Sequence, residues 1–170
     1  REGLQFRNAF CQAPLCMPSR ASMLTERYVR DHGVFENTSI VHPTVPTFVQ
    51  ALAAAGYHTA QTGKTHLYTH SNWPRGRHMR DFAHVLEGYG FRETHETAGK
   101  EASLHVDSLY TDYLAEHGLL KGYRDYVRTR SKAMRETVPG VEISAAWRTE
   151  PLPLPLHAHP DVWLGAYTAD

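Results

Sequence analysis

Three residues near the amino terminus have the types and spacing that chemistry on an anion requires. Cys16 offers a thiol, Pro18 follows it by two residues, and Arg20 follows it by four. The run from Ser19 to Arg30 holds good helix formers and neither Gly nor Pro, so it predicts a helix that begins just after the cysteine. Because free N–H groups and the positive end of the helix dipole gather at a helix N-terminus, we expect Cys16 to lie where an anion is favoured.

Lys64 and His66 form a second group of candidate residues. They are separated by Thr65 and follow residues 57–62, which predict a short strand. Alternate residues of an extended segment face the same side, so Lys64 and His66 can share a face while Thr65 points away. A cation beside an imidazole is suited to binding an anion and moving a proton. The alternative is a solvated strand end without a function.

The elements that must position these residues alternate between strand and helix over the first 67 residues. Leu4 to Phe10 alternates with a period of two and predicts a strand. Thr44 is a reasonable N-cap for a helix over residues 45–55, which Gly56 ends. Strands that lead into helices place side chains at strand ends. The alternation favours an α/β fold with a mostly parallel sheet flanked by helices, incomplete in this chain.

The rest of the chain carries less functional signal. We predict irregular structure over 71–102 around one short helix at 79–86, a helical part over 103–136 with helices at 103–117 and 121–136, a Pro-rich loop over 138–160, and the start of a helix over 161–170. With a best-supported core over residues 1–70, these ranges are interpreted as one partial catalytic domain spanning residues 1–170.

The amino-acid composition gives no sign of nucleic-acid binding, a membrane span, a disulfide framework or a histidine metal site. Eighteen Lys and Arg balance eighteen Asp and Glu, so no basic face for nucleic acid is predicted. No run of about eighteen apolar residues is present, so no membrane span is predicted. Cys11 and Cys16 are too few for a disulfide framework, and Cys11 is interpreted as a small buried hydrophobe. Seven of the twelve histidines show no recognised ligand spacing for a metal: His78, His84, His95, His105, His117, His157 and His159. His157 and His159 could chelate a metal weakly, and a surface loop is the preferred interpretation of that segment.

The segment Cys16-Met17-Pro18-Ser19-Arg20, with Ala21 to Arg27 after it, resembles the signature of the formylglycine-dependent sulfatases, in the alkaline-phosphatase superfamily. The resemblance covers the first seventy residues and is thin beyond Tyr68. It also rests on Phe6 to Phe10, His32-Gly33-Val34 with Asn37, Ala55 to Ala60, Gly63 to Leu67, and the neighbourhood of Asp161 to Gly165. One departure is Glu26, which stands where the family usually has Gly.

The resemblance implies a modified nucleophile. A formylglycine-generating enzyme would read Cys16, Pro18 and Arg20 in the unfolded chain and oxidise the cysteine to an aldehyde. One hydroxyl of the hydrated aldehyde then attacks sulfur and expels the alcohol, and the second collapses to the aldehyde and releases sulfate. By the same resemblance, Arg20 holds the diol oxygen or the carboxylate shell of a metal, Lys64 contacts sulfate, and His66 assists the collapse.

The resemblance also implies one divalent cation, Ca²⁺ first, with Mn²⁺ or Mg²⁺ as alternatives. Of this chain, modified Cys16 alone is named as a metal ligand, and we expect the acidic ligands to lie before Arg1 and after Asp170. The full-length parent is therefore expected to be a sulfuric ester hydrolase acting on a small-molecule or carbohydrate sulfate ester, and the fragment alone is expected to be inactive. Because the chain starts without Met or a signal segment, a cytoplasmic and a periplasmic location both stay open.

Two other functions stay open at the level of sequence. Gly63-Lys64-Thr65-His66 resembles the form found in relatives that cleave phosphonate monoesters and phosphodiesters. Glu26, together with the absent metal ligands, is compatible with a non-catalytic sulfatase-like module. For Cys16 itself, the alternative is a buried structural thiol.

Overall fold

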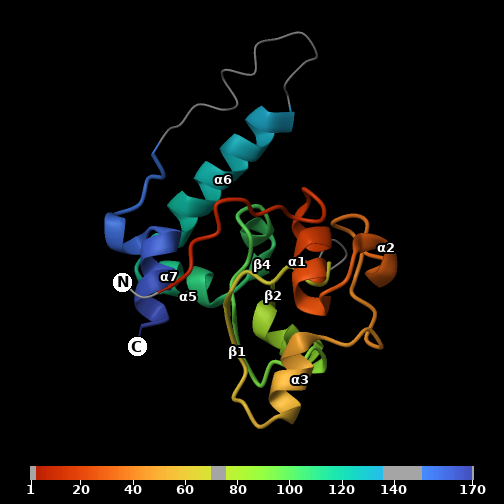
Figure 1. The fold of residues 1–170 in the computed structure, drawn as a ribbon. Coiled ribbons are helices and arrows are strands. Elements are labelled where there is room, and N and C mark those ends of the chain that lie inside the picture. Colours follow the sequence, from red (N-terminus) through yellow and green to blue (C-terminus); the bar gives the residue numbers. More distant parts are fainter. Residues whose placement is uncertain (1–2, 70–75, 136–150, 170) are drawn as a thin grey trace. The chain divides into compact units, whose positions relative to one another are not determined.

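A computed structural model describes residues 3–69, 76–135 and 151–169 (Figure 1). The chain divides into two compact units, and each is described by itself. Unit 1 comprises Arg1–Thr59, His66–Asn72 and Gly88–Arg92, and unit 2 comprises Ala60–Thr65, Trp73–Glu87 and Glu93–Asp170. None of the helices in the described ranges has the length and apolar character needed to cross a membrane.

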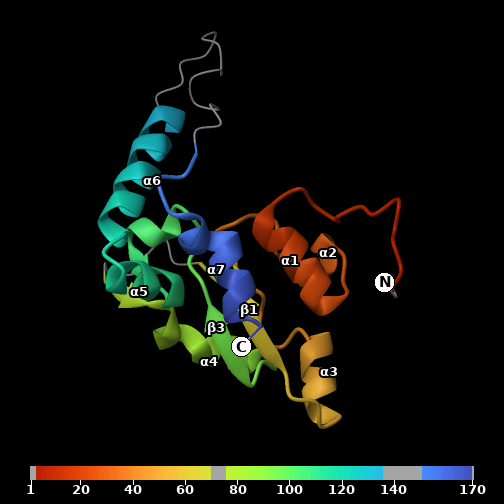
Figure 2. The same ribbon diagram turned by 90° about the vertical axis from the view of Figure 1, so that its left-hand side faces the viewer.

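Unit 1 begins with two short helices, α1 (Cys16–Thr25) and α2 (Val29–His32), which lie side by side in Figures 1 and 2. The prediction of one helix from Ser19 to Arg30 is wrong, because Glu26 adopts the left-handed conformation (φ 56°, ψ 29°) and ends α1. The helix also begins three residues earlier than predicted. Gly33 ends α2 in the same conformation (φ 73°), as its position in the sequence indicated.

The third helix of unit 1, α3 (Phe48–Ala54), begins at a capping box. Oγ1 of Thr47 accepts a hydrogen bond from the N–H of Gln50 (3.0 Å), and Oε1 of Gln50 accepts one from the N–H of Thr47 (3.0 Å). The predicted cap, Thr44, instead pairs with Nδ1 of His42 (2.7 Å). The helix therefore starts later than predicted, because Gln50 lies at the spacing that completes the box for Thr47.

The start of α3 is fixed to the loop Gly88-Tyr89-Gly90 of the same unit. Oγ1 of Thr47 donates to the carbonyl of Tyr89 (2.7 Å), and Nε2 of Gln50 donates to that of Gly88 (2.8 Å). Gly90 has φ 101°, and a Cβ there would stand 2.6 Å from the backbone nitrogen of Gln50. Only glycine allows this close approach.

The described residues of unit 2 include four short strands in two parallel pairs. β1 (Ala60–Gly63) pairs with β3 (Glu93–Glu96), visible side by side in Figure 2, and β2 (Arg77–His78) pairs with β4 (Val106–Asp107). Helices with short parallel strands agree with the α/β prediction at this coarse level. The predicted strand at Leu4 to Phe10 is not formed: residues 3–10 are irregular and exposed. A period-two pattern cannot make a strand without a neighbour to receive its backbone hydrogen bonds.

The helices in the described residues of unit 2 are η1 (Met79–Phe82), α4 (Ala83–Gly88, whose last residue belongs to unit 1), η2 (Ala102–Leu104), α5 (Leu109–Glu116), α6 (Leu120–Arg135), η4 (Leu156–Ala158) and α7 (Pro160–Tyr167). The last four of them supply an aromatic core. The core cluster consists of Tyr110, Leu114, Tyr123, Val127, Ala158 and Trp163. The helix predicted at 79–86 is found as the 3-10 turn η1 followed by α4, and the one predicted at 121–136 is found as α6, up to Arg135 in the described residues. The helix predicted at 103–117 begins only at Leu109. Of the predicted Pro-rich loop, residues 138–150 lie outside the described part of the chain.

Candidate active site

Cys16 is the first residue of α1 and its side chain is exposed. The N-cap position is held by Leu15, whose side chain has no acceptor for the free N–H groups of the first turn. Asn37 supplies that acceptor from twenty residues along the chain: its Oδ1 accepts a hydrogen bond from the N–H of Met17 (2.9 Å). Pro18 has no N–H to satisfy. The end of the helix that carries Cys16 is thus fixed by a side chain outside α1.

A second contact joins α1 to α2. Nδ1 of His32 accepts a hydrogen bond from the N–H of Val34 (3.1 Å), so the proton of the neutral ring lies on Nε2, which donates to Oγ of Ser22 (2.9 Å). Burial lowers the pKa of His32, and the nearby carboxylate of Asp31 opposes this to a smaller degree. His32 is therefore a neutral link that holds the helix of Cys16 in place.

Arg20 stands four residues after Cys16 on α1 and is half-buried. Residues four apart share one face of a helix, so the structure places the thiol and the guanidinium on the same side of α1. The prediction that Cys11 is buried is wrong: Cys11 and Cys16 are both exposed and both free. Cys11 lies in the irregular segment before α1, which offers no apolar surroundings to cover it.

Lys64 and His66 follow the end of β1, as their sequence position indicated. The backbone around them is not a continuous strand, because Gly63 (φ 92°) and His66 (φ 52°) both adopt positive φ. The alternation that would put both side chains on one face therefore does not apply to this segment. Lys64 belongs to unit 2, whereas His66 belongs to unit 1 with Cys16 and Arg20.

Lys64 borders a cavity of about 480 Å³ that is built entirely from unit 2. A Cβ on Gly99 would lie 3.5 Å from Cε and from Nζ of Lys64, so the lysine runs along the backbone of Gly99. Lys100, Tyr126 and Trp163 also line this cavity. Sequence reasoning found Lys64 but not these partners, since they come from segments distant in the sequence.

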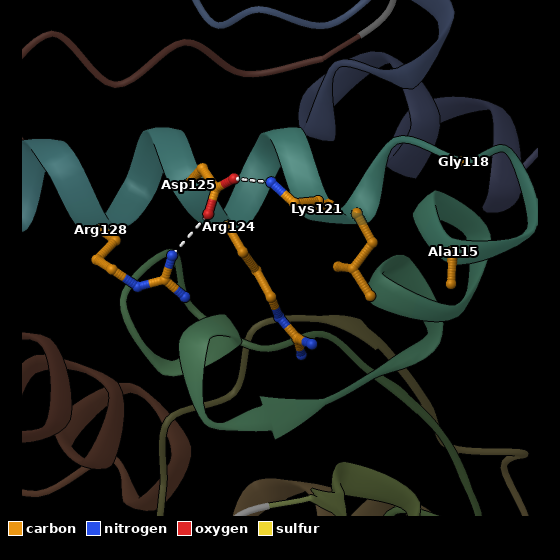
Figure 3. A pocket seen from close by; sticks show the side chains of 7 residues that line it. Ala115, Gly118, Lys121, Arg124, Asp125 and Arg128 are labelled. Atoms are coloured by element: carbon orange, nitrogen blue, oxygen red, sulfur yellow. Dashed lines mark hydrogen bonds and ion pairs between the residues drawn. The ribbon is translucent and has the colours of Figure 1, made fainter.

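A second cavity of about 480 Å³ lies along α6, and Figure 3 shows its polar lining. Nζ of Lys121 lies 2.7 Å from Oδ2 of Asp125, and Nη1 of Arg128 lies 2.6 Å from Oδ1 of the same carboxylate. The hydrogen bonds from Lys121 and then Arg128 lower the pKa of Asp125. Arg124 pairs with Asp107 at the end of β4. These charges are engaged with one another, so this surface is best explained as a solvated, ion-paired helix face.

The arrangement of possible metal ligands bears on the expected divalent cation. Within 3–69, 76–135 and 151–169, no three His, Cys, Asp or Glu side chains lie close enough together to hold a metal ion. The residues in these ranges therefore do not form a metal centre among themselves.

Comparison with known proteins agrees with the motif that begins at Cys16. The Sulfatase family model matches residues 1–127. The chain is 33% identical over 66 residues to the choline-sulfatase of Rhizobium meliloti (39% of this chain, 13% of that protein). It is 39% identical over 66 residues to the N-acetylglucosamine-6-O-sulfatase of Bacteroides thetaiotaomicron (39% of this chain, 12% of that protein).

A third relative is the uncharacterized sulfatase YidJ of Escherichia coli, which is 33% identical over 75 residues (44% of this chain, 15% of that protein). In all three cases the match spans less than a fifth of the relative's own length. The family match, by contrast, extends over most of this chain and includes both Cys16 and Lys64. The chain belongs to the sulfatase family.

Proposed function

We propose that the whole protein hydrolyses sulfate esters and that Cys16, converted to formylglycine, is its nucleophile. One observation carries this proposal: Cys16 is exposed at the first residue of α1, with Arg20 one turn later on the same face, in a chain that the family matches over residues 1–127. A structural thiol would gain nothing from this exposed position. A formylglycine-generating enzyme is the partner that the proposal requires.

The proposed chemistry assigns a separate task to each candidate residue. The hydrated aldehyde supplies one oxygen that forms a bond to sulfur as the alcohol leaves, and a second oxygen whose proton is removed as sulfate is released. Arg20 stabilises charge on the attacking oxygen through its guanidinium. Lys64 binds the sulfate oxygens, and His66 accepts the proton during the second step.

The names of the relatives support a substrate class for this proposal. One acts on choline sulfate and another on an N-acetylglucosamine 6-O-sulfate, by their names. We extend to this protein a small-molecule or carbohydrate sulfate ester. The named matches are to sulfatases, so they do not favour a phosphonate or phosphodiester substrate. The resemblance adds a divalent cation, Ca²⁺ first, for which modified Cys16 is the ligand proposed from this chain.

The first experiment follows the mass of the Cys16 peptide in the full-length protein, co-expressed with a formylglycine-generating enzyme. Conversion of the thiol to the aldehyde lowers the mass by about eighteen daltons and creates the activated nucleophile. Release of sulfate from 4-nitrophenyl sulfate is then measured for the protein and for two variants, Cys16→Ala and Cys11→Ala.

We expect Cys16→Ala to reduce turnover by at least about a thousandfold, because the covalent route is lost. Cys11→Ala is the matched control, since Cys11 is also exposed but lies outside the helix, and we expect it to keep full activity. An unmodified Cys16 under conditions that convert a known sulfatase would overturn the proposal. Equal activity of the two variants would overturn it as well.

A further inference from the structure

Two hydrogen bonds fix the peptide group that leads into Lys64. The carbonyl oxygen of Gly63, which belongs to the peptide between Gly63 and Lys64, accepts a hydrogen bond from the N–H of Thr97 (3.1 Å). It accepts a second one from Nε2 of Gln61 (2.6 Å). A carbonyl oxygen has two lone pairs, so both are engaged. Because the peptide group is planar, these two donors set its orientation and with it the direction in which the chain enters Lys64.

The turn at Gly63 and the side chain of Lys64 are also held by packing. Gly63 has φ 92°, and a Cβ there would stand 3.2 Å from Cδ2 of Leu164 on α7. Glycine takes this conformation without strain and leaves room for the leucine. A Cβ on Gly99 would lie 3.5 Å from Nζ of Lys64, so the lysine runs past a backbone that carries no side chain. Lys64 is thus held at its backbone and along its side chain by residues of unit 2.

Gln61 is a costly residue for its position on β1. It is 9% exposed, and its Oε1 has no hydrogen-bond partner in the part of the chain that the structure describes. A buried amide oxygen without a partner costs free energy, whereas an apolar side chain would carry no such cost. Only the amide nitrogen can donate to a carbonyl, so the oxygen cannot take its place at Gly63. The donor Nε2 is therefore the feature of Gln61 that an apolar residue could not replace.

We propose that Gln61 is a positioning residue for Lys64, which it orients through the carbonyl of Gly63. The inference rests on the proposed function, because it takes Lys64 as the contact for the sulfate oxygens. Without the Gln61 donor, the N–H of Thr97 alone holds the peptide, which can then rotate about that single hydrogen bond. The ammonium group is displaced as a result, and a displacement of about 1 Å can cost about a hundredfold in rate.

The test replaces Gln61 in the full-length, formylglycine-containing protein. Methionine is unbranched, apolar and similar in length, so Gln61→Met removes the donor and the unpartnered oxygen together. We expect kcat/KM for 4-nitrophenyl sulfate to fall about tenfold, less than a full ångström of displacement would cost. The midpoint of thermal unfolding should be unchanged or higher, because a buried orphan acceptor is lost. A lower midpoint together with lower activity would give Gln61 a merely structural role and overturn the inference.

Thr62→Val is the matched control. Thr62 lies between Gln61 and Gly63 on the same strand, but it is exposed. Its substitution changes the side chain nearest in sequence and leaves both donors to the Gly63 carbonyl in place. We expect unchanged kcat/KM and an unchanged unfolding midpoint. An equal loss of activity in Thr62→Val would mean that any change in β1 has this effect, and the inference would fall.

A double-variant comparison tests whether Gln61 acts through Lys64. Gln61→Met is combined with Lys64→Ala, and kcat/KM is compared with that of Lys64→Ala alone. Once the ammonium group is gone its position no longer matters, so we expect Gln61→Met to change kcat/KM by less than about twofold in this background. The same factor in both backgrounds would show that Gln61 acts independently of Lys64, which would overturn the inference.

The outcomes separate this inference from the function on which it rests. No sulfate release by the unsubstituted protein removes the proposed function, and the inference with it. Sulfate release with full activity in Gln61→Met leaves the function standing and overturns the inference. A loss in Gln61→Met that disappears in the Lys64→Ala background, without a lower unfolding midpoint, supports both.

Discussion

The two units of this chain differ in the internal contacts that stabilise each of them. Unit 2 has a core of large rings and aliphatic side chains around Trp163, with edge and stacking contacts between the rings. Unit 1 buries smaller, mostly aliphatic side chains such as Met17, Val34 and Val41. Its segments are also joined by single hydrogen bonds, which link Met17 to Asn37, Ser22 to His32, and Tyr89 to Val41. Of the large apolar side chains exposed in the described residues, all but Leu156 and Val162 belong to unit 1.

This difference distinguishes the contacts that stabilise a unit from the contacts that position the candidate catalytic residues. The proposed nucleophile and its arginine lie in unit 1, where the hydrogen bond from the N–H of Met17 to Asn37 fixes the start of the helix that carries them. The cavity beside Lys64 lies in the unit that has its own aromatic core. Substitutions should therefore cost unit 2 more stability and unit 1 more precision, and the following changes test that contrast.

The largest expected effect is that of Trp163→Ala. It removes a buried indole that contacts three aromatic rings, and we expect a loss of about 3–5 kcal/mol in the free energy of unfolding. Val162→Ala is the matched control, because Val162 is the preceding residue of α7 and is 42% exposed. Denaturant unfolding monitored with amide hydrogen exchange in unit 2 measures both. A loss for Val162→Ala as large as that for Trp163→Ala would contradict the aromatic core as the source of stability.

Asn37→Ala should cost less, about 1 kcal/mol, since it removes one capping acceptor from α1. Asn37→Asp keeps the acceptor and adds a negative charge that a helix N-terminus favours, so it should restore stability. The measurement is the exchange rate of the Met17 amide, which should rise in Asn37→Ala alone. Thr38→Ala, in the neighbouring exposed residue, is the control. An unchanged exchange rate of the Met17 amide in Asn37→Ala would contradict the capping role of Asn37.

Glu26→Gly should stabilise unit 1 by about 1 kcal/mol, because a left-handed backbone costs a residue with a Cβ about that much. Glu26→Ala keeps the Cβ and should bring no gain. The midpoint of denaturant unfolding, at an unchanged denaturant dependence, distinguishes the two variants. This prediction also explains the resemblance, in which glycine is usual at this position. Equal midpoints for the Gly and Ala variants would show that the left-handed conformation costs nothing.

The smallest effect concerns pH. Burial holds the pKa of His32 below its ordinary value of 6.5, so below pH 6.5 the unfolded chain binds more protons than the folded one. Stability that is present above pH 6.5 is then lost as pH falls toward the folded-state pKa. His32→Gln should flatten this dependence, while His42→Gln, in an exposed histidine of the same unit, should not. The same slope in both variants would assign the acid sensitivity to other groups.

Local patterns predicted the fold where one segment decides its own structure. The helix predicted over 121–136 follows from periodicity and is found as α6, up to Arg135 in the described residues. Sequence patterns gave a wrong secondary structure where that structure depends on a neighbouring strand or on the backbone angle of one residue. The strand predicted at Leu4 to Phe10 does not form, because it has no neighbouring strand among the described residues. Helix propensity does not predict that the backbone of Glu26 adopts a left-handed conformation.

The candidate site also combines features that the sequence predicted with features that it did not. Cys16 and Arg20 share a face because α1 begins at Cys16, three residues earlier than the sequence predicted. The cap from Asn37 could not be predicted, because the capping signals that a sequence shows are local and this acceptor lies twenty residues away. Lys64 was identified by its motif, whereas the cavity that it borders is assembled from segments up to a hundred residues further along.

The twenty residues that separate Asn37 from Met17 also set the delay between the synthesis of the two hydrogen-bond partners. A ribosome adds roughly 5–20 residues per second, so Asn37 follows Met17 after about one to four seconds. Until then the first turn of α1 lacks its cap, and the segment around Cys16 can still be bound in extended form by the proposed modifying enzyme. The hydrogen bond that Oδ1 of Asn37 accepts from the N–H of Met17 can therefore form only after this interval.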